Sequence, residues 1–537
     1  MEINKNKPRV DRGIFYSSLI LLLLIIVPLS LYPESGSAVL SSILSYTTNQ
    51  LGWVYLLFAV VVMGLLGYLA LGPYGRIRFG DEAPEFSTFS WIGMIFTAGI
   101  GSSILYWAPQ EWAFYYKAPP FGAEALSPQA AELAVGYGFF HWGLSAWAIF
   151  CIPSLPIAYQ YFVKKRPFLR LSQACTETLG ESHANGLVGK IIDIAVIFGI
   201  LGGLGTTIGL GTPMVSTLIG SIFDIEAGFS LNLVVMGIWV LMFSASVSLG
   251  LQKGIKRLSD ANMVLALVFL GAILVVGPTA FIINSMLSGL GFMFDNFMHM
   301  SLWTDSVAGG GFPQSWTIFY WAWWVSWAPF VSIFIARISR GRTIRETIFT
   351  VVGFGSLGCW IYYAVLGNYG LYQQVNEGLE VTRILTEEGG AAAVLAVLSS
   401  LPFSTLAVVV YTILAFICLS TSLDSAAYTL SAIATDNLEQ HQDPALWHRI
   451  FWAFALAALP LTLILIGGGK EGSLKAIQTS SIVLALPLTC VLSLVIYNFF
   501  RVLKQSEKSD QSEDILRISG LADADEEMRR VHSVVNS

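Results

Sequence analysis

Residues 316–330 read WTIFYWAWWVSWAPF, and this stretch carries five tryptophans, one tyrosine, two phenylalanines and no charged residue. An uncharged helix of about 20 apolar residues is long enough to cross the ~30 Å hydrocarbon core of a bilayer. The whole chain has the same character, because 55% of its 537 residues are hydrophobic, only 12% are charged and the mean hydropathy is +0.67. A soluble protein carries about 25% charged residues. The composition therefore predicts an all-α polytopic membrane protein.

Hydropathy and the placement of charge give the topology. We expect twelve transmembrane helices, at residues 14–32, 52–72, 88–116, 138–161, 190–219, 230–248, 259–284, 315–336, 345–366, 403–435, 450–468 and 478–501. With a cytoplasmic N-terminus, all but four of the 29 lysines and arginines fall on the cytoplasmic side. The exceptions are Lys117, Arg383, Lys470 and Lys475. This asymmetry obeys the positive-inside rule and predicts that both termini are cytoplasmic.

The segments outside the spans divide the chain further. Residues 1–13 are basic and lead into a first helix that we expect to be retained rather than cleaved as a signal peptide. Residues 285–303 are apolar with scattered polar positions, and they predict an amphipathic helix lying along the periplasmic interface within 285–314. Residues 367–402 are too polar to span and predict an external cap. Residues 502–537 form a polar cytoplasmic tail.

The third span carries a cluster of small residues at mid-depth, formed by Gly99, Gly101, Ser102 and Ser103. Each glycine lowers the stability of a helix by about 1 kcal/mol. Such a cluster fits close packing of two helices. It fits equally well an unwound helix whose free carbonyls and amides bind a solute or an ion. The sequence leaves both explanations open.

The aromatic residues of the opening stretch follow helical spacing. Trp316, Tyr320, Trp323 and Trp327 form one stripe, and Trp324 stands beside it. Such a stripe is more often a packing seam than a site. The spans, however, show no cluster of carboxylates that could hold a cation. Stacked indole faces then offer another way to hold a quaternary ammonium group, through cation–π attraction of about 0.5–2 kcal/mol each.

The tenth span contains CLSTSLDSAAYTLS at residues 418–431, in which hydroxyl side chains surround Asp424. Hydroxyls that bond to their own helix explain this pattern without any ligand. A sodium site is the alternative, because a hard cation prefers oxygen ligands from hydroxyls and from the carbonyls of an unwound neighbour. An enzyme would instead need an acid, base or metal constellation, and no HExxH or DxD pattern occurs within the spans. We therefore expect neither enzymatic activity nor nucleic-acid binding.

Several motifs together resemble the betaine/choline/carnitine transporter (BCCT) family over residues 10–505. The resemblance rests on FYWAWWVSWAPFVSIFIARISRGRT (319–343), FFHW…W (139–147), GLQKGIKRLSDANM (250–263), GGFPQSW (310–316) and TSLDSA (421–426). It implies a LeuT-like core of two inverted five-helix repeats, at 88–284 and 315–501, preceded by two additional helices at 14–87. It also implies a homotrimer in the bacterial cytoplasmic (inner) membrane.

The resemblance also implies the site residues. The family's aromatic box falls on Trp142, Trp147, Phe150 and Trp324, with Trp323 and Trp327 beside it and with Phe114 and Tyr320 as the positions emphasised in the carnitine branch. The sodium-coupled branch binds its ion at positions that match Thr97, Ile100, Cys418, Thr421 and Ser422. The sodium-independent antiporters carry an arginine near the neutral Asn262. Sodium coupling is therefore expected, with no other cofactor.

The resulting expectation is a secondary transporter that imports a small methylated-ammonium osmolyte. Glycine betaine is the first candidate, and trimethylamine N-oxide, dimethylsulfoniopropionate and carnitine remain open. The alternative is a sodium-independent substrate:substrate antiporter of the carnitine/butyrobetaine type.

Overall fold

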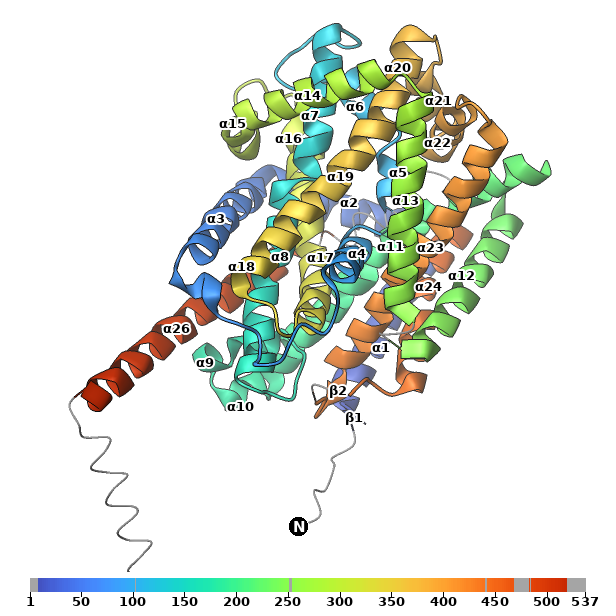
Figure 1. Ribbon diagram of the computed structural model, residues 1–537. Coiled ribbons are helices and arrows are strands. Elements are labelled where there is room, and N and C mark those ends of the chain that lie inside the picture. Colours follow the sequence, from blue (N-terminus) through green and yellow to red (C-terminus); the bar gives the residue numbers. More distant parts are fainter. Residues whose placement is uncertain are drawn as a thin grey trace, which may run out of the picture.

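The computed structural model describes residues 8–101, 103–250, 254–439, 442–467, 482 and 484–518. Ser102, which belongs to the predicted unwound segment, and most of the predicted tail lie outside the described residues. The described part is almost entirely helical (Figure 1). Its elements are β1 (Arg9–Val10), α1 (Arg12–Leu31), α2 (Pro33–Gln50), α3 (Gly52–Leu71), η1 (Pro73–Arg76), α4 (Thr88–Gly99), α5 (Ser103–Trp107), α6 (Glu111–Lys117), α7 (Pro128–His141), α8 (Leu144–Ala158), η2 (Tyr159–Val163), η3 (Ser172–Cys175), α9 (Thr176–Leu179), α10 (Glu181–Ala184), α11 (Leu187–Phe223), α12 (Phe229–Gly250), α13 (Lys256–Val276), α14 (Thr279–Asp295), α15 (Phe297–Leu302), α16 (Phe312–Ser315), α17 (Thr317–Ile338), α18 (Ile344–Ile348), η5 (Phe349–Phe354), α19 (Gly355–Tyr362), η6 (Tyr363–Gly367), α20 (Asn368–Asn376), α21 (Val381–Glu387), α22 (Gly390–Ser399), α23 (Ser404–Ile433), β2 (Thr435–Asp436), α24 (Leu446–Gly467) and α26 (Ala485–Ile518).

Nine helical stretches of the described residues are long and apolar enough to cross a membrane. Each predicted span contains helix, although residues 478–481 and 483 of the twelfth span lie outside the described residues, and the shorter apolar helices Arg12–Leu24 and Thr88–Gly99 overlap the first and third predicted spans. These helices confirm the all-α polytopic membrane fold. The fourth and ninth spans are longer than predicted, because helical structure runs over Pro128–Val163 and Ile344–Asn376.

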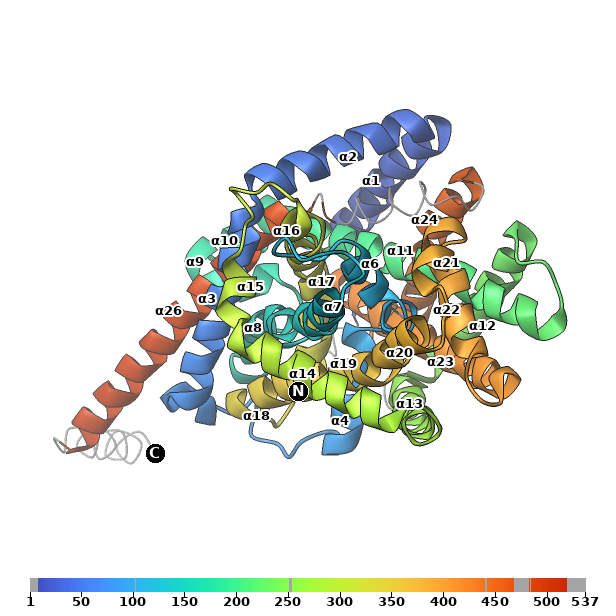
Figure 2. The ribbon, with the colours of Figure 1, turned by 90° about the horizontal axis from the view of Figure 1, so that it is seen from above.

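The most enclosed helices are α8 and α17. In the most apolar windows of Pro128–Val163 and Phe312–Ile338, 94% of the residues are buried inside the protein, against 33% for α12 and for α13. Figure 2 shows α7, α8 and α17 near the centre of the bundle, while α12 lies at its edge. The aromatic stretch therefore faces protein on all sides, whereas α12 and α13 leave much of their surface open to lipid.

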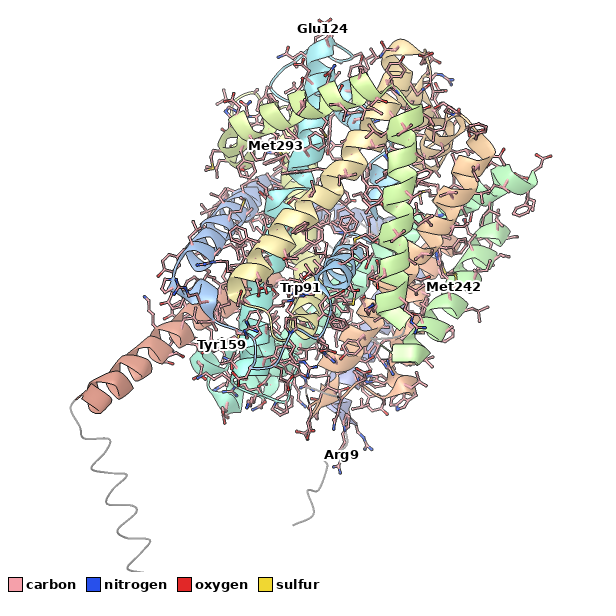
Figure 3. All side chains as sticks on the ribbon, in the orientation of Figure 1. Arg9, Trp91, Glu124, Tyr159, Met242 and Met293 are labelled. Carbon is pink, nitrogen blue, oxygen red and sulfur yellow. The ribbon has the colours of Figure 1, made fainter. Side chains whose placement is uncertain are left out.

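The two ends of the bundle differ. At one end β1 pairs antiparallel with β2, and we call this the ribbon end. Figure 3 places Arg9 at the ribbon end and Glu124 at the opposite end. Across that opposite end runs α14, which begins at Thr279 and covers most of the predicted interfacial helix (Figure 1). The predicted cap at 367–402 consists of α20, α21 and α22.

The third predicted span is broken. The first part, α4, ends at Gly99, and helical structure resumes at Ser103 in α5 and again at Glu111 in α6. Gly101 lies between α4 and α5 with φ +56°, a left-handed conformation that a glycine adopts without steric cost. Of the two explanations that the sequence left open, the structure therefore has the unwound helix.

Candidate substrate and ion sites

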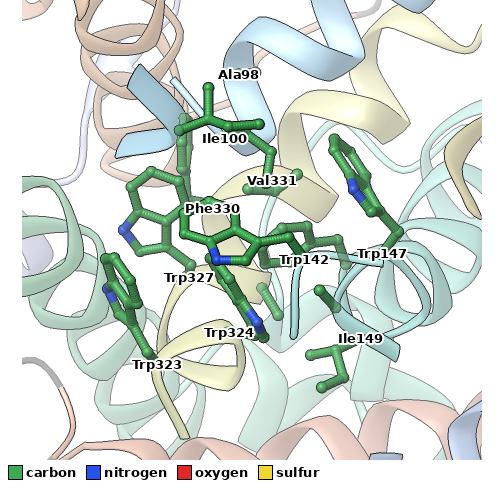
Figure 4. Close-up of a cluster of buried hydrophobic side chains, with 14 of the residues drawn as sticks. Ala98, Ile100, Trp142, Trp147, Ile149, Trp323, Trp324, Trp327, Phe330 and Val331 are labelled. Carbon is green, nitrogen blue, oxygen red and sulfur yellow. The ribbon is translucent and has the colours of Figure 1, made fainter. Parts of the chain in front are cut away.

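The predicted box residues Trp142 and Trp324 are brought into direct contact. Trp142 follows α7, Trp324 lies on α17, and their ring centroids are 5.0 Å apart at an interplanar angle of 75°. Phe150 of α8 meets the Trp324 ring edge-on at 5.6 Å. Trp323 stacks on Trp324 at 5.0 Å and 11°. All four side chains are buried (Figure 4).

The remaining aromatic residues of the prediction are arranged around this pair. Tyr320 stacks on Trp324 at 5.6 Å, and Trp327 lies 6.4 Å from Trp323. Trp147 contacts Phe150 at 5.8 Å but otherwise stacks on Phe96, so it forms the far side of the cluster. Figure 4 shows Trp147 set apart from the other labelled indoles.

Phe114 does not join the cluster. Its ring contacts Trp107 and Trp316, at 6.2 and 5.3 Å. These three side chains line a cavity of about 1030 Å³, whose wall also includes residues of α2, α11 and the cap. The structure therefore assigns Phe114 to a vestibule next to the box rather than to the box itself. In this conformation the indole rings touch one another, so the box is closed.

Hydrogen bonds fix the two central rings in orientation. Trp324 Nε1 donates to the carbonyl oxygen of His141 at 3.1 Å. Trp142 Nε1 donates to Glu111 Oε2 at 2.8 Å. The indole N–H groups of Trp323 and Trp327, in contrast, are buried without a hydrogen-bond partner among the described residues.

Glu111 is a buried residue beside the aromatic box that the sequence reasoning missed. It is fully buried, and its carboxylate accepts hydrogen bonds from the Trp142 indole and from three tyrosine hydroxyls, those of Tyr115, Tyr320 and Tyr363. The Tyr320 bond is 2.8 Å long. A single carboxylate therefore lies beside the aromatic residues, although the sequence shows no cluster of carboxylates in the spans. Glu111 is a single glutamate among aromatic residues in a predicted span, and an ionisable residue at such a position indicates a site even without a second carboxylate.

The predicted ion-binding residues meet where α4 ends against α23. Ser422 Oγ donates to the carbonyl oxygens of Thr97 and Cys418, at 2.9 and 3.2 Å. Thr421 Oγ1 donates to the Cys418 carbonyl at 2.8 Å. Ile100 is buried beside Gly101, and its N–H bonds to the Phe96 carbonyl at 3.1 Å.

The glycines of the break make these contacts possible. A Cβ on Gly101 would lie 2.3 Å from Ser422 Oγ, and a Cβ on Gly99 would lie 2.8 Å from the Trp147 ring. After the break, Ser103 Oγ bonds to Thr207 Oγ1 of α11 at 2.9 Å. The unwound segment is therefore adjacent both to the aromatic box and to the hydroxyls of α23. The aromatic cluster therefore lies beside a group of backbone and hydroxyl oxygens.

Comparison with known proteins identifies the family of the chain. The family model described as "BCCT, betaine/carnitine/choline family transporter" matches residues 13–508. The chain belongs to this family. Membership confirms the LeuT-like fold class and shows that the protein is a transporter of a family that handles small quaternary-ammonium compounds.

One solved structure is also similar. It is described as the substrate-bound outward-open state of a Na⁺-coupled sialic acid symporter, with 12% identity, a TM-score of 0.44, and coverage of 84% of this chain and 87% of that one. A likeness at this level is too weak to bear on function.

Proposed function

We propose that this BCCT transporter is a sodium-coupled symporter that imports a methylated-ammonium osmolyte, glycine betaine first, by alternating access. Trimethylamine N-oxide, dimethylsulfoniopropionate and carnitine are the further candidates. We place it in the bacterial inner membrane with both termini cytoplasmic, and we expect a homotrimer. The proposal rests on the family and on the chemistry of the two neighbouring sites.

The observation that carries the substrate proposal is the fixed orientation of two indole faces. The bonds from Trp142 to Glu111 and from Trp324 to His141 hold both rings, so separating them would present two π faces to one cation. The Glu111 carboxylate behind Trp142 adds an attractive charge. The buried, unpartnered N–H groups of Trp323 and Trp327 could donate to the carboxylate of a betaine.

Sodium coupling is supported by the junction of α4 and α23. Ser422 Oγ lies 2.9 Å from the Thr97 carbonyl oxygen and 3.2 Å from the Cys418 carbonyl oxygen. A sodium ion bound by lone pairs of these three oxygens would take the place of the two hydrogen bonds, while the hydroxyl keeps its proton. Asn262, where the antiporters carry an arginine, is neutral and donates to Cys418 Sγ at 3.7 Å. This position beside the junction therefore carries a neutral amide rather than a guanidinium.

The test is uptake of radiolabelled glycine betaine into proteoliposomes, with an inward sodium gradient or with potassium in its place. Uptake that requires sodium is the expected result. Uptake that is independent of sodium and rises when the vesicles are preloaded with substrate would contradict the coupling and establish the antiporter instead. No uptake in either buffer would exclude glycine betaine, and the same assay would then pass to the N-oxide and sulfonium candidates.

A further inference from the structure

Asp424 of α23 is a buried carboxylate without a hydrogen-bond partner. It is 0% exposed, and within the described part of the chain neither Oδ1 nor Oδ2 accepts a hydrogen bond. Other buried carboxylates of this protein are satisfied: Glu111 has its aromatic donors, and Asp193 accepts bonds from Ser172 N and Oγ at 3.1 and 2.7 Å. An unsatisfied carboxylate inside a membrane protein costs several kcal/mol, which marks Asp424 as functional.

Two unsatisfied hydroxyls accompany Asp424. The hydroxyl of Ser246 on α12 is adjacent to the Asp424 carboxylate without forming a well-oriented hydrogen bond to it, and Ser246 Oγ is itself buried without a partner among the described residues. Ser420 lies one helical turn before Asp424, on the same face of α23, and its hydroxyl is also buried and unpartnered there. Four oxygen atoms, the two of the Asp424 carboxylate and the hydroxyl oxygens of Ser246 and Ser420, thus lack hydrogen-bond partners among the described residues on this face of α23.

Ser420 differs from its neighbours on α23. Five nearby hydroxyls donate to carbonyls of their own helix, as side chains of this kind do inside membranes: Thr421, Ser422, Ser425, Thr429 and Ser431. Back-bonding therefore explains these five residues but not Ser420. The unpartnered hydroxyl of Ser420 is therefore better explained by a ligand than by hydrogen bonding to its own helix.

This group is separate from the junction at Ser422. Residues two apart on a helix point about 200° from each other, so Asp424 and Ser422 lie on opposite faces of α23. Ser422 contacts α4, whereas Asp424 faces α12. Asp424 precedes the end of α23 at Ile433 by about two and a half turns, toward the ribbon end.

We infer that Asp424, Ser420 and Ser246 bind a monovalent cation of the sodium class between α23 and α12. Oxygen ligands select a hard cation, and a single carboxylate balances one positive charge, whereas calcium sites gather several acidic ligands. Among the described residues, the positive group that acts on Asp424 is the Arg449 guanidinium of α24, which offsets part of the carboxylate charge. The inference goes beyond the proposed function because it adds a second cation to the one at the junction.

The experiment measures binding of radioactive sodium to the purified full-length transporter, without substrate and against a potassium background. Wild type should bind about two sodium ions per chain, and Asp424→Asn and Ser422→Ala about one each. Ser420→Ala and Ser246→Ala, which leave the charge in place, should weaken the second site about tenfold, equivalent to about 1.4 kcal/mol. Asp193→Asn is the matched control, because that buried aspartate is already bonded to Ser172, and it should bind sodium as wild type does.

Three results would overturn the inference. One is sodium binding by Asp424→Asn with the same stoichiometry and affinity as wild type. Another is a single wild-type site that Ser422→Ala removes, which would leave the junction as the sodium site and sodium-coupled transport intact. The third is no sodium binding by wild type, in which case the separate uptake assay decides the proposed function. If Asp424→Asn fails to elute as a folded particle, the two serine variants decide the matter.

Discussion

At the scale of single residues, hydrogen bonds from the indole N–H groups hold the two central tryptophans, Trp142 and Trp324, and leave their π faces free of hydrogen bonds. Both indole N–H groups are bonded to protein acceptors, Trp142 to a carboxylate and Trp324 to a carbonyl. Rotation of either ring would leave a buried donor unpaired, at a cost of about 1–3 kcal/mol. The hydrogen bonds therefore fix the tilt of both rings, and binding of a cation between them requires the two rings to move apart.

Replacing Trp324 by leucine should abolish saturable substrate binding. Leucine keeps an apolar side chain on α17 but removes the π face that meets Trp142 and Phe150, and each cation–π contact contributes about 0.5–2 kcal/mol. Trp324→Phe, which retains a smaller π face, should keep weak binding. Titration of the purified variants by calorimetry, with gel filtration to check assembly, measures the effect. Near-normal affinity in the leucine variant would remove Trp324 from the substrate site.

Replacing Glu111 by glutamine should weaken binding of a cationic substrate about tenfold. The change removes the negative charge behind Trp142 and turns one acceptor oxygen into a donor amide, which conflicts with the surrounding indole and hydroxyl donors. Calorimetric titration is again the measurement. Glu124→Gln, in an exposed loop, is the control for loss of one carboxylate. Unchanged affinity in Glu111→Gln would reduce Glu111 to a structural role.

At the scale of elements, the sequence predicts those helices that contain a long, uninterrupted run of apolar residues. The predicted span at 315–336 is α17, Thr317–Ile338, in the structure. It could be predicted because an uncharged apolar run of this length is easily recognised in the sequence. The helix α2 was not predicted, since its serines and threonines give no apolar pattern and instead bond to their own helix, as Thr47 does to Ile43 O at 2.8 Å.

The sequence could not predict the contacts within the sites, because they form only through tertiary packing. Spacing placed Trp323, Trp324 and Trp327 on one helix, but the donors around Glu111 come from four separate segments and meet only through tertiary packing. Likewise, the sequence marks Asp424 among hydroxyls without telling which hydroxyls the helix itself satisfies. The break at Gly101 could be located from composition, yet only its φ value distinguishes unwinding from close packing.

The junction of α4 and α23 predicts how sodium dependence responds to mutation. Replacing Thr421 and Ser422 together by alanine removes the hydroxyls next to the Thr97 and Cys418 carbonyls, so the sodium concentration for half-maximal uptake should rise about tenfold. Thr429→Ala is the matched control, because Thr429 makes the same kind of bond to Ser425 O, at 2.8 Å, farther along α23. Uptake in proteoliposomes over a range of sodium concentrations measures the effect. A wild-type sodium response in the double variant would move the coupling site elsewhere.

At the scale of the whole molecule, an ionic cluster ties the first helix to the core at the ribbon end. Asp11 caps α1 and pairs with Arg170 at 3.4 Å and with Lys190 of α11 at 3.2 Å. Arg170 also pairs with Asp436 of β2 at 2.8 Å, and Asp436 is the strand partner of Arg9. The cluster joins α1, which precedes the predicted repeats, to α11 and to the chain following α23. It therefore fixes one end of several spans at once.

Replacing Asp11 by asparagine should destabilise the protein by about 3 kcal/mol at neutral pH. Asparagine still caps α1, so the loss isolates the two ion pairs. Burial alone would raise the pKa of Asp11, but the Ile14 N–H and the charges of Arg170 and Lys190 outweigh burial and hold the pKa below its usual 3.8. Because the folded-state pKa is depressed, the stabilisation is complete above the unfolded pKa and disappears as the pH falls through the folded value. Thermal unfolding in detergent should thus show a constant gap between wild type and Asp11→Asn from about pH 5 to 8, narrowing as the pH drops below 3.8. A gap that persists undiminished at the lowest pH would mean that the variant acts through packing rather than through charge.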